Sequence, residues 1–311
     1  MNKKNKNFIF FTIIILISGL AGILSGYLLN KTVNTQSVSN NIYIEDYKKY
    51  IKEGNNIKDI EKVLDKLLKQ VNSQEEKSVL IDGLITAIYN MSDKLNMQLI
   101  AFQNDLAYIE KKYEIKDFNK DNIEKINDDV IKTFLKKIRN SYLLIEKRGN
   151  EYYIIVDIES IMKKYENYMN KDLKQILKIR LNEQKRPSYN YSLQEFNFNN
   201  IINNLVFLNE NKIDKTSPYY QQYIEYKAFY YDALLGKTHK MHLDEKGKVK
   251  DNVIKVYEKI ANSNYYFSND VKEYLNILKQ NNYIFNDNVE KYLNDLFKKF
   301  EINISLSETN K

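Results

Sequence analysis

The chain holds few of the side chains on which catalysis and metal binding usually depend. It contains no cysteine and only two histidines, His239 and His242. Both stand in the segment KTHKMHLDE, where Asp244 and Glu245 follow them. An H-x-x-H pair in a loop lacks the i, i+4 spacing and the glutamate of a zinc-peptidase helix. We therefore expect a solvated loop here, and no metal, cofactor or thiol chemistry.

Sequence motifs for phosphate binding and serine catalysis are also missing. The chain has no G-x-x-x-x-G-K-[ST] loop, no G-x-G-x-x-G turn and no G-x-S-x-G elbow. We accordingly predict no catalytic residue and a non-enzymatic protein. The 41 acidic residues leave one enzymatic alternative open. It is a cell-wall-acting hydrolase that uses paired carboxylates.

Tyrosines dominate one stretch of the chain. Residues 218–235 read PYYQQYIEYKAFYYDALL. On a helix turning about 100° per residue, four tyrosines fall within about 60° of one another. The simpler interpretation is a central helix buried between neighbours, and the alternative is an aromatic groove for a glycan or a peptide. The candidate interaction residues are Tyr219, Tyr223, Tyr226 and Tyr230.

Basic residues outnumber acidic ones between residues 131 and 186. A helix at 121–139 followed by a hairpin with two basic residues at its tip resembles the end of a winged-helix domain, which implies phosphate contacts. Anionic wall polymers or lipid head groups would satisfy the same charge. The candidate contact residues are Lys136, Lys137, Arg139, Lys147 and Arg148.

An uncharged apolar segment lies near the N-terminus. Residues 8–29 read FIFFTIIILISGLAGILSGYLL, long enough as a helix to cross a hydrocarbon core of about 30 Å. Lys3, Lys4 and Lys6 precede it, so the positive-inside rule places the N-terminus in the cytoplasm and the rest of the chain outside. We therefore expect the chain to contact the membrane through residues 8–29. A cleaved signal peptide is the alternative.

Small residues share one face of this apolar segment. Ser18, Gly22 and Gly26 follow one another at i, i+4 spacing. Such a face allows a second membrane helix to approach closely. It predicts a homodimer through the anchor.

Helices are favoured over the remaining chain, because only five of the 8 glycines and both of the 2 prolines lie outside the apolar segment. Apolar residues at helical spacing predict helices at 57–71, 74–113 and 121–139. The stripe along 74–113 is typical of a core-facing helix, and an extended stalk or coiled-coil surface is the alternative. Strand-forming residues around Gly149-Asn150 instead predict a β-hairpin at about 142–156.

Capping signals mark further helices. Asp157 is placed to cap a helix that runs to about Gln184, and Ser192 to Glu195 match a capping box. Pro218 opens another helix and Gly236 closes it.

A weak repeat follows towards the C-terminus. Val253, Val271 and Val289 are evenly spaced, and each follows an Asn/Asp pair. Apolar residues recur three, four and seven positions after each valine. This pattern predicts three stacked antiparallel helices.

These features together predict a mainly α fold class, with one transmembrane helix and then a helical bundle or short α-solenoid that carries one β-hairpin. The segments are 1–7 (cytoplasmic), 8–29 (transmembrane), 30–41 (linker), 42–187 (helical domain with the hairpin), 188–302 (repeat-like helical region) and 303–311 (polar tail).

The function expected from these features is that of a non-enzymatic interaction or scaffold protein of the bacterial envelope. It would be anchored in the cell membrane with its domain outside the cytoplasm. A protein or an anionic wall polymer is the expected partner, and nucleic acid is not. If the topology were reversed, a winged-helix-like nucleic-acid binder would become the alternative.

Overall fold

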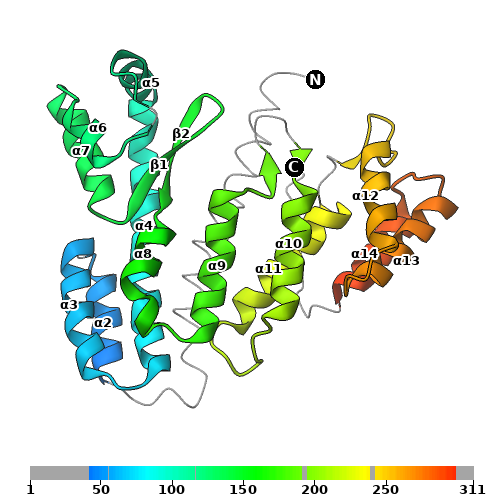
Figure 1. Ribbon diagram of the computed structural model, residues 1–311, viewed down its shortest axis with the longest axis horizontal. Coiled ribbons are helices and arrows are strands. Elements are labelled where there is room, and N and C mark those ends of the chain that lie inside the picture. The colour runs from blue at the N-terminus through cyan, green and yellow to red at the C-terminus, as the bar shows by residue number, and fades with distance from the viewer. Residues whose placement is uncertain (1–41, 55, 116, 191–194, 239–241, 299–311) are drawn as a thin grey trace. The chain divides into compact units, whose positions relative to one another are not determined.

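The computed structural model describes residues 42–54, 56–115, 117–190, 195–238 and 242–298. Within these ranges the chain is mainly α-helical, as the sequence predicts (Figure 1). None of the helices described there is long and apolar enough to cross a membrane. The expected anchor at 8–29, the linker at 30–41 and the tail at 303–311 lie outside the described residues.

The chain divides into two compact units after Leu177, inside helix α9 (Lys171–Lys185). We expected the division after residue 187. The difference arises because the C-terminal half of α9 carries Glu183, whose carboxylate is hydrogen-bonded to groups of the second unit. The units are described separately below.

The first unit is built around α4 (Gln74–Leu99), which is buried on nearly every side between Leu80 and Ile88. Helices α2 and α3 and the hairpin strand β2 contact α4. Ser73 caps its N-terminus by accepting a hydrogen bond from the Glu76 N–H. The other helices of this unit are α2 (Ile42–Lys52), α3 (Ile57–Gln70), α5 (Gln103–Lys112), α6 (Lys120–Glu124), α7 (Asp129–Arg139) and α8 (Ile158–Tyr165).

Three helices expected to be continuous are interrupted. A 3-10 turn, η2 (Ile100–Phe102), separates α4 from α5, and residues 125–128 separate α6 from α7. Asp128 caps α7 by accepting a hydrogen bond from the Ile131 N–H, and Val130 in the first turn of this helix is 69% exposed. The helix after Asp157 also ends early, because η3 (Glu166–Tyr168) and Asn170 interrupt it before α9.

The predicted hairpin is confirmed. Strands β1 (Leu143–Arg148) and β2 (Glu151–Val156) pair antiparallel, with Leu143 opposite Val156 and Arg148 opposite Glu151. Gly149 at the turn has φ +64°, the left-handed conformation for which glycine is suited. Asp157 then caps α8 through the Ser160 N–H, as expected.

The second unit begins with the remainder of α9, followed by α10 (Phe198–Glu210) and α11 (Tyr220–Leu235). A short ladder, β3 (Tyr189–Asn190) with β4 (Glu195–Phe196), precedes α10. The predicted capping box is wrong, because Glu195 lies in β4 and Asn197 caps α10; Ser192 is outside the described residues. Gly236 ends α11 at φ +74°, and a Cβ there would lie 2.7 Å from His242 Nδ1.

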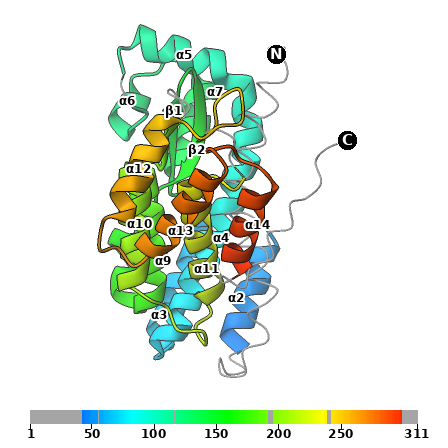
Figure 2. The ribbon, with the colours of Figure 1, turned by 90° about the vertical axis from the view of Figure 1, so that its right-hand side faces the viewer.

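The weak repeat corresponds to three consecutive helices, α12 (Asp251–Ala261), α13 (Ser268–Gln280) and α14 (Asp287–Lys298). Figure 2 shows α13 beside both α12 and α14, and these two pairs are in contact. All three helices bury the valine of the repeat and the residues four and seven positions later. The residue three positions later is buried only in α13, where it is Tyr274.

Candidate binding surface in the second unit

Exposed aromatic rings gather in the loop between α12 and α13. Tyr265 and Tyr266 are 41% and 36% exposed, whereas the next residue, Phe267, is fully buried. The Phe267 ring lies parallel to that of Tyr265 at 5.3 Å and edge-on to that of Tyr266 at 5.0 Å. A buried ring therefore supports two exposed ones, which limits their rotation.

A lysine from α11 borders these rings. Lys227 is half-buried, and its Nζ lies 5.3 Å from the centre of the Tyr266 ring. Burial lowers the pKa of this ammonium, and nearby Lys212 lowers it further, although Asp270 acts in the opposite direction. In the same unit, the Tyr231 hydroxyl donates a hydrogen bond to Asp270 Oδ2 at 3.1 Å.

We call Tyr265, Tyr266 and Lys227 the aromatic platform. It combines two aromatic faces, the Tyr265 hydroxyl and one cation on a supported surface. Such a surface is suited to burying apolar area while it pairs with a carbonyl, a carboxylate or an aromatic ring of a ligand. Sequence reasoning missed it. The available signal was the run of three aromatic residues at 265–267, between two repeat helices.

The tyrosines singled out from the sequence lie mostly inside the unit. Tyr219, Tyr223 and Tyr230 are 2%, 5% and 0% exposed, and Tyr226 is half-buried. The Tyr223 hydroxyl donates to the Leu208 carbonyl at 3.1 Å. This is the placement expected of a central helix. Without rearrangement, a ligand could reach only Tyr226 among the four.

The carboxylate of Glu183, a half-buried residue, connects the neighbouring helices. Glu183 accepts hydrogen bonds from the Ser188 N–H and hydroxyl at 2.9 and 2.5 Å, from the Tyr230 hydroxyl at 2.9 Å, and from the Asn204 and Asn200 amides at 2.9 and 3.2 Å. Burial raises the pKa of Glu183, and the donors offset part of that rise. The group joins α9, α10 and α11 through one acceptor.

In the first unit, the basic residues of α7 are largely matched by local carboxylates. Lys136 lies 2.8 Å from Glu124, and Arg139 lies 3.9 Å from Asp157. Lys137 is exposed, and it forms no ion pair with any described residue. Because local pairing reduces the field felt by a polyanion, this helix offers less attraction than its sequence indicates.

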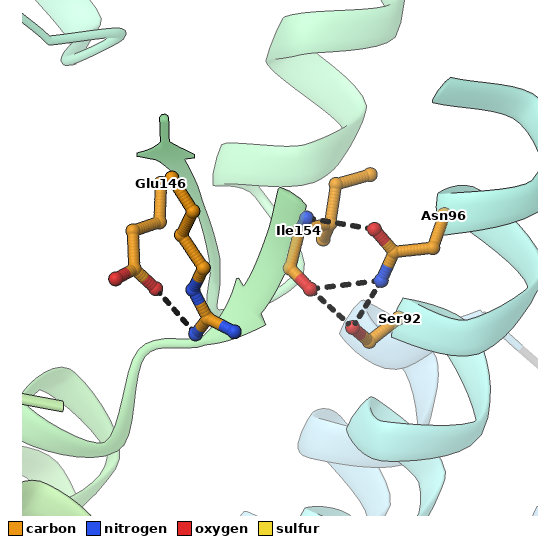
Figure 3. Close-up of polar contacts among 5 residues, drawn as sticks. Ser92, Asn96, Glu146 and Ile154 are labelled. Atoms are coloured by element: carbon orange, nitrogen blue, oxygen red, sulfur yellow. Dashed lines mark hydrogen bonds and ion pairs between the residues drawn. The ribbon is translucent and has the colours of Figure 1, made fainter. Parts of the chain in front are cut away.

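The basic residues near the hairpin tip are paired as well. Lys147 lies 2.5 Å from Glu110, which also accepts a hydrogen bond from the Tyr152 hydroxyl. Burial and this hydrogen bond raise the pKa of Tyr152 to about 12. Arg148 lies 2.7 Å from Glu146, which is labelled in Figure 3.

Two side chains of α4, shown in Figure 3, and one of α5 cover the outer edge of β2. The Asn96 amide pairs with both backbone groups of Ile154, at 2.8 and 2.9 Å, and Ser92 donates to the same carbonyl. Gln103 pairs in the same way with both backbone groups of Tyr152, each at 2.8 Å. The hairpin is thus fixed to the helices along one edge.

One pair of carboxylates lies close together on α3. Glu61 and Asp65 share Lys164, whose Nζ lies 2.5 and 3.1 Å from them, and they accept hydrogen bonds from the hydroxyls of Tyr142 and Tyr165. Burial raises the pKa of both tyrosines, and the carboxylates raise it further. For Lys164, burial acts to lower the pKa, but the two carboxylates outweigh it and raise the value. With pKa values raised in this way, the lysine stays charged and the two tyrosines stay neutral. Such groups suit a structural link better than proton transfer.

The second histidine corrects the expectation of a solvated loop. His242 is 3% exposed, and its Nδ1 lies 3.0 Å from the Tyr257 hydroxyl, which donates to the Leu234 carbonyl. No group of three or more metal-binding side chains occurs in the described part of the chain. His239 and the proposed anchor face of Ser18, Gly22 and Gly26 lie outside it.

Comparison with known proteins gives no relative. No family model, no curated protein and no solved structure matches this chain.

Proposed function

We propose that this chain is a membrane-anchored, extracytoplasmic interaction or scaffold protein of the bacterial envelope, without catalytic activity of its own. The aromatic platform is the observation that carries the interaction role, because Tyr265 and Tyr266 are exposed on a buried ring. The apolar segment 8–29 is the observation that supports the anchor and the location.

A protein partner fits the platform better than a wall polymer does. Tyrosine is enriched at the centres of protein interfaces, where a ring held in place loses little entropy on binding. The platform carries one cation, Lys227, rather than an extended basic stripe. The basic residues of the first unit are mostly paired locally, which weakens the case for an anionic polymer or nucleic acid.

The hydrolase alternative finds limited support in the described residues. An acid catalyst needs a carboxyl group whose proton can reach a substrate. Glu183 has a raised pKa, but its oxygens accept hydrogen bonds from four residues of the unit. Glu61 and Asp65 are joined by Lys164. We therefore propose binding rather than hydrolysis.

The test is photocrosslinking of the full chain in living cells. A photoreactive amino acid replaces Tyr265, and in a matched control it replaces Tyr43, which is 50% exposed in the first unit. We expect position 265 to yield a discrete protein adduct that position 43 does not. Lys227→Met should weaken that adduct, because the platform loses its cation while the helix is kept.

Two results would contradict the proposal. If position 265 gives no adduct, or the same adducts as position 43, the platform is not a protein-binding surface. If the purified full chain instead releases fragments from isolated wall material, and Glu183→Gln or Glu61→Gln stops that release, the chain is a hydrolase.

A further inference from the structure

The two edges of the β-hairpin differ in how their backbone groups are paired. The Asn96 amide pairs with the N–H and the carbonyl of Ile154, as Figure 3 shows, and the Gln103 amide does the same for Tyr152. The backbone groups of Ile154 and Tyr152 therefore point away from β1. Helical side chains thus take the place of a neighbouring strand along the outer edge of β2.

The outer edge of β1 is not paired in this way. Ile145 and Lys147 lie opposite Ile154 and Tyr152, and in an antiparallel ladder both members of such a pair turn their backbone groups outward. The N–H and carbonyl groups of Ile145 and Lys147 form no hydrogen bond with any residue that the structure describes. Ile145 is half-buried and Lys147 is exposed. An edge of this kind is a template for another extended segment.

One segment outside the described residues has the sequence pattern of a strand. Residues 300–307 read FEINISLS, in which apolar and polar residues alternate over the whole length. This period of two is typical of a half-buried strand. The segment is long enough to pair with all 6 residues of β1.

Charge and polarity favour one alignment of this segment on β1. In antiparallel pairing with Ile304 opposite Ile145, Glu301 lies opposite Arg148, so that opposite charges meet across the strands. The apolar residues of the segment then continue the side of the hairpin on which Ile145 is only half-buried. A shift of two residues in one direction would instead place Glu301 opposite Glu146.

The segment fits a second copy better than the hairpin of its own chain. Only Lys299 separates it from the end of α14 at Lys298, so it has almost no linker. Pairing within one chain would require α14 to end beside β1, whereas a second copy can take any orientation. We propose that residues 300–307 of one copy bind as a third strand, antiparallel to β1 of another copy. Each copy carries one edge and one segment, so the contact closes a dimer by exchange or continues into a chain of copies.

Disulfide formation tests this contact, because the natural chain contains no cysteine. Two differently tagged full-length copies, one with Glu146→Cys and one with Asn303→Cys, are produced together and purified in detergent. The proposed alignment places these positions opposite each other as a non-hydrogen-bonded pair, with Cα atoms about 4.5 Å apart, which a disulfide can span. Mild oxidation should therefore join the two tags. Ser307→Cys in place of Asn303→Cys should not join them, because it lies about 13 Å further along the strand.

Proline substitution supplies a matched second test. Lys147→Pro removes an N–H that points away from β2, so the hairpin ladder is kept while the edge of β1 loses a donor. Lys147→Ala loses the same ion pair with Glu110 but keeps the N–H. In the Glu146→Cys copy, Lys147→Pro should lower the disulfide-linked fraction by about tenfold relative to Lys147→Ala.

A variant outside the hairpin guards against a folding defect. Ile304→Pro in the Asn303→Cys copy should lower the linked fraction in the same way while leaving β1 untouched. Thr309→Pro, beyond the segment, is its control and should change little. Melting temperatures of the full chains verify that all variants are folded.

Three outcomes would overturn the proposal. A linked fraction that is equal for Asn303→Cys and Ser307→Cys, or unaffected by both prolines, would mean that the copies meet without pairing strands. A disulfide that forms only when one chain carries both cysteines would mean that the segment binds the hairpin of its own chain. No disulfide at all, with unchanged melting temperatures, would mean that β1 accepts no strand from this chain. The test involves neither the anchor nor the aromatic platform, so its failure would leave the proposed function standing.

Discussion

At the scale of single residues, tyrosine serves here as a core side chain with a polar tip. The hydroxyls of Tyr257 and Tyr274 donate to the carbonyls of Leu234 and Leu235, at 2.9 and 3.0 Å. These carbonyls belong to the last turn of α11, where no helical N–H is available to them. The two tyrosines therefore connect α12 and α13 to the end of α11.

Tyr223 tests this role, because its ring and its hydroxyl can be removed separately. Tyr223→Phe loses only the bond to the Leu208 carbonyl and should lower the free energy of unfolding by about 1 kcal/mol. Tyr223→Ala also leaves a cavity and should cost about 3 kcal/mol. Urea denaturation of the full chain measures both, with the exposed Tyr43→Ala as control. An unchanged midpoint for Tyr223→Ala, together with lost binding of a partner, would assign Tyr223 to a ligand site instead.

Glu183 predicts a pH dependence with a definite sign. Burial raises its pKa in the folded state above the ordinary value of 4.5. Between the unfolded and folded pKa values the native state binds more protons, so this group's contribution to stability is complete below the unfolded pKa. The contribution is lost as the pH rises through the folded pKa.

Chemical denaturation at a series of pH values from about 4 upward checks this behaviour, because the carboxyl of an unfolded glutamate titrates near pH 4.3. The difference in stability between the natural chain and Glu183→Gln should move against the natural chain as the pH rises. A difference that moves in its favour would mean that the hydrogen-bond donors outweigh burial and lower the pKa.

At the scale of elements, the sequence predicts what local chemistry decides. The hairpin follows from strand-forming residues around Gly149, and the ends of two helices follow from Asp157 and Gly236. Apolar spacing identifies the core faces of the repeat helices α12, α13 and α14. These signals act over a few residues, so no tertiary contact is needed to interpret them.

The errors lie where tertiary contacts override local preference. The sequence between Gln74 and Tyr113 favours one long helix, yet η2 interrupts it, next to Gln103 and its bonds to Tyr152. Gln103 and Tyr152 are far apart in the sequence, and a contact over such a separation leaves no periodic pattern of apolar residues. The aromatic platform was missed for a related reason, since exposure of Tyr265 and burial of Phe267 depend on how the two flanking helices meet.

The edge of β2 that side chains of α4 and α5 cover allows a prediction about stability. Asn96→Leu keeps the branched shape of the side chain but leaves the Ile154 N–H without its partner from α4 and the Ile154 carbonyl with Ser92 alone. Because unpaired buried backbone groups are costly, the full chain should lose about 2 kcal/mol of stability. The exposed Asn90 on the same helix provides the control Asn90→Ala, which should change little. Equal effects of the two substitutions would mean that the amide pairing contributes nothing.

At the scale of the whole molecule, the separate features become consistent if the chain is displayed from a membrane. The apolar segment 8–29 would place every copy in one plane. A supported aromatic platform would then act at a raised local concentration. The absence of cysteine suits export without disulfide chemistry, and it makes substituted cysteines unambiguous reporters.

Topology is the prediction on which this arrangement depends. Lys120→Cys and Lys259→Cys place thiols on exposed positions of the first and second units, and Asn5→Cys places one before the apolar segment. A membrane-impermeant maleimide added to intact cells should label the first two and reach Asn5→Cys only after permeabilisation, because the flanking lysines retain the N-terminus in the cytoplasm.

The labelling pattern separates the remaining alternatives. Protection of positions 120 and 259 in intact cells would place the helical units in the cytoplasm, and nucleic acid would then become a reasonable ligand for the basic helix α7. Loss of the Asn5→Cys thiol from the mature chain, with positions 120 and 259 still labelled, would instead indicate a cleaved signal peptide. In that case the units would be exported without a tether.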